Sequence, residues 1–181
     1  MEVSKTNLND VKIIQPKIFE DNRGYFFESY KSTVFSKNNF SSDFLQDNEV
    51  KSKHGVLRGL HYQLKEPQGK LIRVVLGSII DVAVDIRLGS PTFGQYHLVK
   101  LTAENKTMFF IPEGFAHGYL VTSKESIVLY KCTNIYNPDD QYGIRWDDED
   151  IGIKWNNQNP ILSEKDKNLP SLKNQKFLPK Y

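Results

Sequence analysis

The chain has little cysteine: Cys132 is the only one among its 181 residues. A single thiol cannot form an intrachain disulfide, so the fold does not depend on one, and a reducing cytoplasmic setting is expected. No apolar run approaches the roughly 20 residues that a membrane-spanning helix needs. The segment Met1–Lys5 lacks the basic start and the apolar core of a signal peptide. We therefore expect a cytoplasmic protein with no membrane partner.

Neither sign of charge is in excess. The 24 basic residues nearly balance the 22 acidic ones, and the formal net charge is +2. A balanced chain gives no indication of binding to nucleic acid or to an anionic membrane, and neither is expected as a partner. The composition, 39% hydrophobic and 25% charged, is typical of a globular protein. Since the chain has no repeat, linker or low-complexity stretch, we expect one domain over residues 1–181.

Several sequence motifs of common enzymes are also missing. The chain has no glycine-rich phosphate loop, no dinucleotide fingerprint and no Gly-x-Ser-x-Gly elbow. Its histidines do not form the His-x-His or His-x-x-x-His pairs that metal sites often use; they are His54, His61, His97 and His117. We expect no metal and no organic cofactor, although ligands drawn from distant parts of the chain are the alternative. Acid–base chemistry by side chains is what remains.

Polar and apolar residues alternate along most of the chain, with turn residues between the alternating stretches. The clearest pair is residues 71–76 and 79–86, separated by Gly77-Ser78. Strands are predicted over residues 11–19, 25–30, 46–48, 71–76, 79–86, 96–101, 108–111, 115–121, 126–133, 143–146 and 151–155. Residues 21–24 should form a turn, residues 31–43 can hold a short helix, and the tail from residue 159 is expected to be a loop. Many short strands with little helical periodicity favour an all-β sandwich or barrel, of which the jelly roll is one form.

The residues most suited to chemistry lie in the stretch Arg58–Gln63 and at Lys70 a few positions later. Arg58 and Lys70 are cations that can hold a phosphate or a developing oxyanion. His61 titrates near neutral pH and can pass protons. The simpler interpretation is a half-buried strand whose polar face meets water. For the acid, the sequence offers two phenols, Tyr130 and Tyr136, although a tyrosine in a strand is commonly structural.

Two further stretches carry possible binding residues. Gln46 and Asn48 share one face of a strand, because side chains alternate along a strand. Three aromatic residues occupy positions 25–27, and at least one of these rings is expected to pack in the core. The alternative is an aromatic platform for a ring-shaped ligand, with Arg23 and Glu28 at its edge.

Taken together and in this order, the motifs resemble the dTDP-4-dehydrorhamnose 3,5-epimerase family. The similarity covers roughly residues 10–170. The matching stretches are Asp21-Asn22-Arg23-Gly24 with Phe26 and Glu28, Gln46-Asp47-Asn48, Val56 to Gln63, Gly69-Lys70-Leu71, Asp81 to Arg87, Gly89 to Gly94, Ala103 to Lys106, Ile111 to Gly118, Tyr130-Lys131, Tyr136-Asn137-Pro138 and Leu162 to Asp166.

The resemblance implies a cupin-type jelly roll with a few short helices, working as a homodimer without metal or organic cofactor. It implies a substrate that is a nucleotide-linked 4-keto-6-deoxy sugar, inverted at C3 and C5 on the way to L-rhamnose. By position, His61 matches the proton acceptor, Tyr130 the proton donor, and Asp166 the carboxylate paired with that histidine. Other matches are to binding positions: Gln46, Asp47, Asn48, Arg58, Lys70, His117, Tyr136, Gln141 and Lys165. Three more match residues that reach the substrate of the partner subunit: Arg23, Phe26 and Glu28.

Gln141 departs from the family pattern, which carries glutamate there; glutamine keeps an acceptor, gains a donor and loses charge, so the preferred nucleotide is open. The pair Tyr96-His97 also replaces a tryptophan-containing pair. The alternatives within the class are inversion at C3 alone or C5 alone, or action on another nucleotide sugar. Outside it, they are a non-catalytic sugar-binding cupin and a metal-dependent cupin oxygenase, which the missing histidine pair disfavours.

Overall fold

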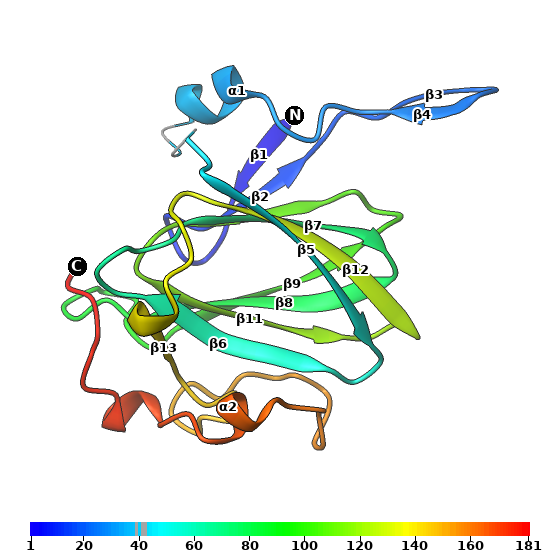
Figure 1. The fold of residues 1–181 in the computed structure, drawn as a ribbon. Helices are drawn as coiled ribbons and strands as arrows, with labels where there is room; N and C mark the ends of the chain where they lie inside the picture. Colours follow the sequence, from blue (N-terminus) through cyan, green and yellow to red (C-terminus); the bar gives the residue numbers. More distant parts are fainter. Residues whose placement is uncertain (39, 41–42) are drawn as a thin grey trace.

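The structure, a computed structural model, describes residues 1–38, 40 and 43–181. Within them, two antiparallel sheets pack face to face (Figure 1). The first sheet has the order β1 (Glu2–Lys5), β2 (Lys12–Gln15), β10 (Met108–Ile111), β7 (Lys70–Leu76), β12 (Glu125–Cys132) and β5 (Gln46–Lys53). The second has the order β13 (Gln141–Gly143), β6 (Leu57–Gln63), β11 (Phe115–Val121), β8 (Ser78–Asp85) and β9 (Tyr96–Thr102).

The smaller elements lie outside the two sheets. A separate hairpin pairs β3 (Phe19–Asp21) with β4 (Gly24–Phe26) around the predicted turn. The predicted short helix is α1 (Ser32–Lys37), although residues 39, 41 and 42 of that stretch are not among the described ones. The remaining elements are the 3-10 helix η1 (Pro138–Asp140), the helix α2 (Glu164–Lys167) and the 3-10 helix η2 (Leu172–Asn174).

The turn between β7 and β8 carries the chain from one sheet to the other. Both strands form where the alternation predicts them, but β7 pairs with β10 and β12, whereas β8 pairs with β11 and β9. Gly77 makes the crossing with a φ of 75°, and a Cβ there would lie 2.1 Å from the carbonyl oxygen of Glu125. Only glycine fits such a position. The predicted all-β jelly roll of the cupin type is confirmed.

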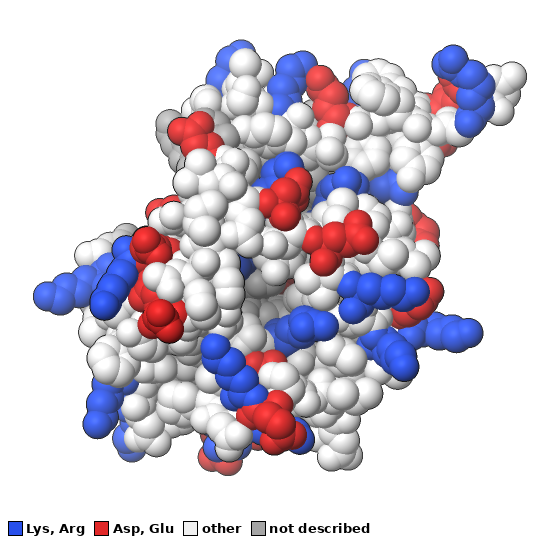
Figure 2. All heavy atoms as spheres, viewed as in Figure 1, with Lys and Arg blue, Asp and Glu red and all other residues white. Residues whose placement is uncertain are grey.

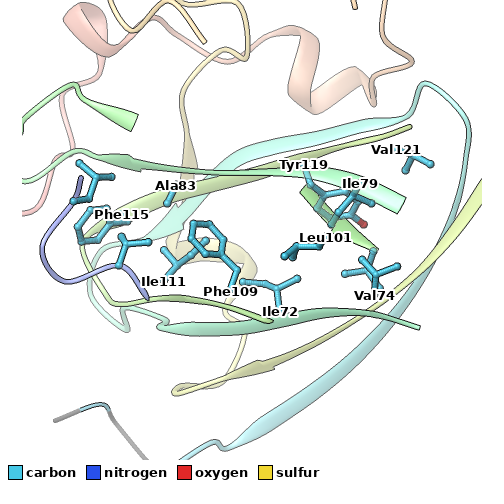
Figure 3. Packing of buried hydrophobic residues seen from close by; sticks show 13 residues of the cluster. Ile72, Val74, Ile79, Ala83, Leu101, Phe109, Ile111, Phe115, Tyr119 and Val121 are labelled. Atoms are coloured by element: carbon cyan, nitrogen blue, oxygen red, sulfur yellow. The ribbon is translucent and has the colours of Figure 1, made fainter. Parts of the chain in front are cut away.

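One half of the space between the sheets is an apolar core (Figure 3). Strands bury every second side chain, so the inward positions of β7 and β10 meet those of β8 and β11. The buried residues of this core are Leu8, Val11, Ile72, Val74, Ile79, Ala83, Leu101, Phe109, Ile111, Phe115, Tyr119, Val121 and Val128. Burying a large apolar side chain contributes about 1.5–3 kcal/mol, which makes this half the stable frame beside the polar half described below.

The chain after β13 covers the outer face of the second sheet. Ile151 and Trp155 are buried against residues of that face such as Val82 and Val84. The predicted strands at 143–146 and 151–155 are wrong: β13 ends at Gly143, and the described residues 151–155 form no strand. Local bonds hold this segment instead: the carboxylate of Asp148 accepts N–H bonds from Asp150, Ile151 and Leu172, and its backbone carbonyl accepts the N–H of Gly152. Apolar alternation there reflects packing as a cover rather than pairing in a sheet.

The tail, predicted to be a loop, contains α2. Ser163 begins this helix, because its hydroxyl oxygen accepts the backbone N–H of Asp166. Figure 1 shows α2 below β6, which brings the last part of the chain to the second sheet. Among the described residues, no helix is long and apolar enough to cross a membrane.

The hairpin β3–β4 projects away from the body of the molecule (Figure 1). Tyr25 and Phe26 are 58% and 65% exposed, and Phe27 is half-buried. The prediction that at least one of these three rings packs in the core is therefore wrong. The exposed rings are stabilised locally: the ammonium of Lys106 lies 4.1 Å from the centre of the Tyr25 ring. The hairpin therefore presents apolar surface with no covering element among the described residues of its own chain.

Candidate active site

A cavity of about 490 Å³ lies between the sheets, beside the apolar core. Figure 2 shows a hollow in this face of the molecule, rimmed by side chains of both charges. The structure brings most of the predicted site residues to the cavity wall: Gln46, Asn48, Arg58, His61, Lys70, His117, Tyr130, Tyr136, Gln141, Lys165 and Asp166. They come from both sheets and from α2.

The alternation of the strands places the catalytic candidates. On β12, Tyr130 and Cys132 face inward, and their cross-strand partners on β7 are Ile72 and Lys70. Ile72 belongs to the apolar core, whereas Lys70 is at the end of the strand that reaches the cavity. The same inward row thus passes from core to cavity within two residues.

The two histidines of the cavity are neighbours. His61 on β6 and His117 on β11 are direct cross-strand partners. The strands approach closely at this point: a Cβ on Gly59 would lie 2.6 Å from the Cα of Gly118. Glycine at both positions lets the two backbones meet, so that two imidazoles face one cavity.

His61 forms a pair with a carboxylate. Its Nε2 lies 2.6 Å from Oδ1 of Asp166, which is 105 residues away in sequence. Burial raises the pKa of Asp166, but hydrogen bonds from His61, Ser163 and Gly59 outweigh it, so the pKa lies below its usual value. An ionised carboxylate only accepts, hence Nε2 of His61 carries a proton in this bond and Nδ1 takes no part in it.

His117 forms a second pair of the same kind. Its Nε2 lies 2.7 Å from Oδ1 of Asp81, a residue of β8 that is completely buried. The other oxygen of this carboxylate, Oδ2, is buried and has no hydrogen-bond partner among the described residues. Both imidazoles are therefore held through Nε2.

Lys70 and Tyr130 supply an ammonium and a phenol. Lys70 is 9% exposed, and no hydrogen bond or ion pair is found for it among the described residues. Burial lowers the pKa of Lys70, and the nearby Cys132 and Asp81 oppose that effect. Burial raises the pKa of Tyr130, with a further contribution from Cys132. At neutral pH the phenol keeps its proton and is available as a donor.

Arg58 lies on the same wall as His61. Its Nε donates to the hydroxyl of Ser52 on β5, a bond of 3.2 Å that links the two sheets. Tyr119 also lines the cavity: burial raises its pKa to about 12, and its hydroxyl has no hydrogen-bond partner among the described residues. The same residues offer no partner to the other guanidinium donors of Arg58, which can therefore bind an anion.

The mouth of the cavity is tied together by Gln141. Its Oε1 accepts from the hydroxyl of Tyr136 at 2.9 Å and from Nζ of Lys165 at 2.6 Å. A lysine only donates, so this atom must be the amide oxygen, and the amide N–H groups of Gln141 point elsewhere. On the first sheet, Gln46 donates to Asn48 and its oxygen accepts the backbone N–H of Tyr136.

Four predicted residues are not brought to the cavity of this chain. Asp47 alternates with its neighbours onto the outer face of the first sheet, where it pairs with Lys131 at 2.7 Å. The other three lie on or just after the projecting hairpin. Within this chain, Arg23 pairs with Asp21, Glu28 pairs with Lys31, and Phe26 is exposed. Their predicted role is in the site of a partner subunit, and it stays a prediction.

The residues at the cavity that sequence reasoning missed include Asp81, which supports it, and Tyr119 and Cys132, which line it. Cys132 could have been predicted, because it lies two residues after Tyr130 on the same strand and its side chain therefore points to the same face. In the sequence, Asp81 is one polar residue in an alternating strand. Its contact with His117, on another strand, becomes visible only in the folded structure. Among residues 1–38, 40 and 43–181, no cluster of three or more His, Cys, Asp or Glu side chains is arranged to hold a metal ion.

Two imidazole–carboxylate pairs, an unpaired ammonium and a protonated phenol share one cavity inside a jelly roll. This combination defines a cupin-type enzyme for acid–base catalysis.

The chain belongs to the dTDP-4-dehydrorhamnose 3,5-epimerase family, whose model matches residues 5–174. Members of this family are isomerases. The chain is 51% identical over 172 residues to the enzyme of that name from Methanothermobacter thermautotrophicus, covering 93% of each chain. It is 52% identical over 171 residues to the one from Shigella flexneri, covering 93% of this chain and 94% of the relative. The dTDP-6-deoxy-D-glucose-3,5-epimerase of Legionella pneumophila, solved with dTDP-4-keto-L-rhamnose, superposes with a TM-score of 0.96 at 44% identity, over 99% of this chain and 98% of that one.

Proposed function

We propose that this protein inverts C3 and C5 of dTDP-4-dehydro-6-deoxy-D-glucose through enolate intermediates, giving dTDP-4-dehydro-L-rhamnose for deoxysugar biosynthesis. The observation that carries the proposal is the cavity itself, which is lined by the imidazole paired with Asp166, by the ammonium of Lys70 and by the phenol of Tyr130. The substrate follows from the names of the relatives at about half identity and from the nucleotide sugar bound to the Legionella enzyme.

Lys70 makes it possible to remove a proton from the carbon next to the C4 ketone. A C–H bond next to the C4 ketone loses its proton only when the resulting enolate oxygen is stabilised. The buried ammonium of Lys70 has no other partner among the described residues and can meet that oxygen. In a cavity that excludes water, this charge is worth more than it would be in solvent.

His61 accepts the proton. Nδ1 takes it from carbon, the C–H electron pair moves into the enolate, and the imidazole becomes imidazolium. Asp166 remains ionised, holds Nε2–H and balances the new positive charge. No group besides these side chains and the substrate changes charge in this step.

Tyr130 returns a proton from the other side. His61 stands on the second sheet and Tyr130 on the first, so the base and the acid approach the sugar ring from opposite walls. The enolate carbon takes the phenolic proton, C4 becomes a ketone again, and the configuration is inverted. The phenolate then takes a proton from solvent and the His61 imidazolium releases one to solvent, which restores both groups for the next step. The same pair can act at C3 and at C5, because both carbons flank C4.

Binding of the nucleotide part of the substrate is assigned to Arg58 and to the residues at the mouth of the cavity. Arg58 has free guanidinium donors for the diphosphate. His117, Gln46, Asn48, Tyr136, Gln141 and Lys165 line the cavity around it and are assigned to substrate binding. Asp47, on the outer face of β5, is assigned at most an indirect part in holding that strand.

The enzyme is proposed to act as a homodimer in the cytoplasm. The projecting hairpin carries exposed aromatic rings together with Arg23 and Glu28, as expected of an arm that completes a partner's site. A free, buried thiol at Cys132 agrees with a reducing compartment.

Isotope exchange tests the proposal directly. The protein is incubated with dTDP-4-keto-6-deoxyglucose in D₂O, and C3 and C5 are followed by NMR. Deuterium at both carbons with inversion at both is expected. Inversion at one carbon would identify a C3-only or C5-only epimerase, and inversion only with another nucleotide sugar would change the substrate. Binding without exchange would indicate a non-catalytic sugar-binding cupin.

A further inference from the structure

Asp81 is a charged residue in a place where the fold alone does not require one. It lies in the middle of β8, between Ile80 and Val82, and its side chain is completely buried. Burying a carboxylate is costly unless other groups compensate for the lost water. One of its oxygens, Oδ2, has no hydrogen-bond partner among the described residues, so hydrogen bonding accounts for only part of that compensation.

The groups that do face Asp81 belong to the cavity. Its Oδ1 accepts from Nε2 of His117 at 2.7 Å. Asp81 also acts on Lys70, whose lowered pKa it partly restores. The thiol of Cys132 acts on Lys70 as well, but burial raises the pKa of that thiol, so it is neutral at physiological pH. Asp81 is thus the carboxyl group that acts on Lys70.

Several elements contribute titratable or charged groups to the cavity that Lys70 lines, whereas β10, which pairs with β7 at Lys70, contributes none. β12 contributes Tyr130 and Cys132, and β8 contributes Asp81. β6 contributes Arg58 and His61, and β11 contributes His117 and Tyr119; beyond the strands, α2 contributes Lys165 and Asp166. Both Asp166 and Asp81 are bonded to a histidine, but Asp81 is the one that acts on Lys70, and its Oδ2 has no hydrogen-bond partner among the described residues. Asp81 is therefore the carboxylate that can balance the ammonium.

We propose that Asp81 is a positioning residue of the active site: it holds His117 through Nε2 and keeps the proton on Lys70. Through His117 it fixes which nitrogen faces the cavity. Through its charge it offsets the cost of keeping an ammonium in a buried, otherwise unpaired place. This inference rests on the proposed function only for the role of Lys70, which is to stabilise the enolate oxygen. Its first test needs no substrate.

The first test measures the proton on Lys70. The chain is labelled with 13C at the lysine ε-carbons, and the Lys70 signal is assigned by its disappearance in Lys70→Arg. In Asp81→Asn, which keeps the shape and an acceptor but removes the charge, the signal should titrate roughly one pH unit lower than in the wild type. Asp148→Asn, which removes a buried carboxylate in the outer cover, should leave it unchanged. An unchanged Lys70 titration in Asp81→Asn would overturn the proposal.

The second test follows kcat against pH. With Lys70 losing its proton earlier, Asp81→Asn should be close to wild type on the acid side and about tenfold slower on the alkaline limb, which moves to lower pH. A purely structural role would lower the melting temperature and leave the shape of the profile alone. Asp81→Glu, which restores the charge, should move the limb back even if it packs less well. If the wild type itself shows no epimerase activity, the proposed function fails while the lysine titration still decides the role of Asp81.

Discussion

His61 and His117 are direct cross-strand partners, and each is bonded through Nε2 to its own carboxylate, Asp166 and Asp81. The two pairs differ in how they meet the rest of the fold. Asp166 arrives on α2 from outside the sheets, whereas Asp81 is built into β8. One site therefore contains a pair that depends on the covering segment and a pair that belongs to the frame.

The first prediction concerns the base. His61→Asn has no basic nitrogen at position 61, so deuterium exchange at C3 and C5 and product formation should fall together. The expected loss is about 10²–10⁴-fold. Asparagine keeps a polar side chain there, so matching melting temperatures will show that the loss is chemical. Exchange at the wild-type rate in this variant would exclude His61 as the base.

The second prediction separates the two proton transfers. Tyr130→Phe keeps His61 and Lys70, so the enolate should still form, and His61 can return the proton only to the face it left. Deuterium should enter with retained configuration and little epimer should appear by NMR. Phenylalanine preserves the ring packing against the core. Epimerisation near the wild-type rate would instead point to Tyr136, whose hydroxyl also lines the cavity mouth.

The third prediction tests whether the projecting hairpin β3–β4 completes the active site of the partner subunit. Arg23→Ala and His61→Ala homodimers should each be nearly inactive. When they are mixed and allowed to exchange subunits, one site of each heterodimer carries both changes and the other carries neither, so part of the activity should return. Exchange is checked by native mass spectrometry of an isotope-labelled partner. If heterodimers form without recovered activity, each site is built from one chain.

The fourth prediction concerns metals. The proposed steps use only side chains, so prolonged dialysis against a strong chelator should leave kcat unchanged. The metal content before and after dialysis is measured by mass spectrometry. A large loss of activity that one divalent ion restores would require a different mechanism.

The fifth prediction concerns stability in acid. Burial raises the pKa of Asp85, but hydrogen bonds from Arg87, Ser90 and Thr92 outweigh it and hold the pKa at about 2. A pKa lowered by folding stabilises the protein above its ordinary value near 4, and that stabilisation is lost as the pH falls toward 2. The expected contribution is about 2 kcal/mol.

The measurement is the free energy of urea unfolding for wild type and Asp85→Asn between pH 6 and pH 2. Their difference should shrink by about that amount as the pH falls. Asp10→Asn, which removes the half-exposed outer partner of Arg87, is the control and should show a much smaller change. A constant difference across the range would show that Asp85 titrates normally, and NMR titration of its carboxyl would confirm this.

The sequence predicts the frame well, because the frame follows a local rule. Alternation located β11 residue for residue and β12 within one residue, and it placed Gln46 and Asn48 on the same face of a strand, the face that lines the cavity. The same rule failed for residues 151–155, where apolar side chains pack as a cover and side chains satisfy the backbone. Alternation reports which residues are buried and does not report whether a strand exists to pair with.

The site was harder to predict than the frame. Asp166 could be joined to His61 only by resemblance, since no local pattern connects residues 105 positions apart. Asp81 and Tyr119 were missed for the same reason: their importance lies in which strand is their neighbour, and strand order is a property of the whole fold. Asp47 shows the limit of resemblance, because a motif match between Gln46 and Asn48 does not put the middle residue on their face.

The place of Asp166 in the chain has a consequence for biosynthesis. A protein is made from its N-terminus, and domains form as the chain emerges. All strands of the described residues end by Gly143, so the residues of both sheets leave the ribosome before Asp166 does. His61 would then stand in a finished barrel without its carboxylate, and the nascent enzyme would stay inactive until the covering segment docks. Ribosome-bound chains stalled before and after residue 166 would separate the time at which the protein folds from the time at which it begins to work.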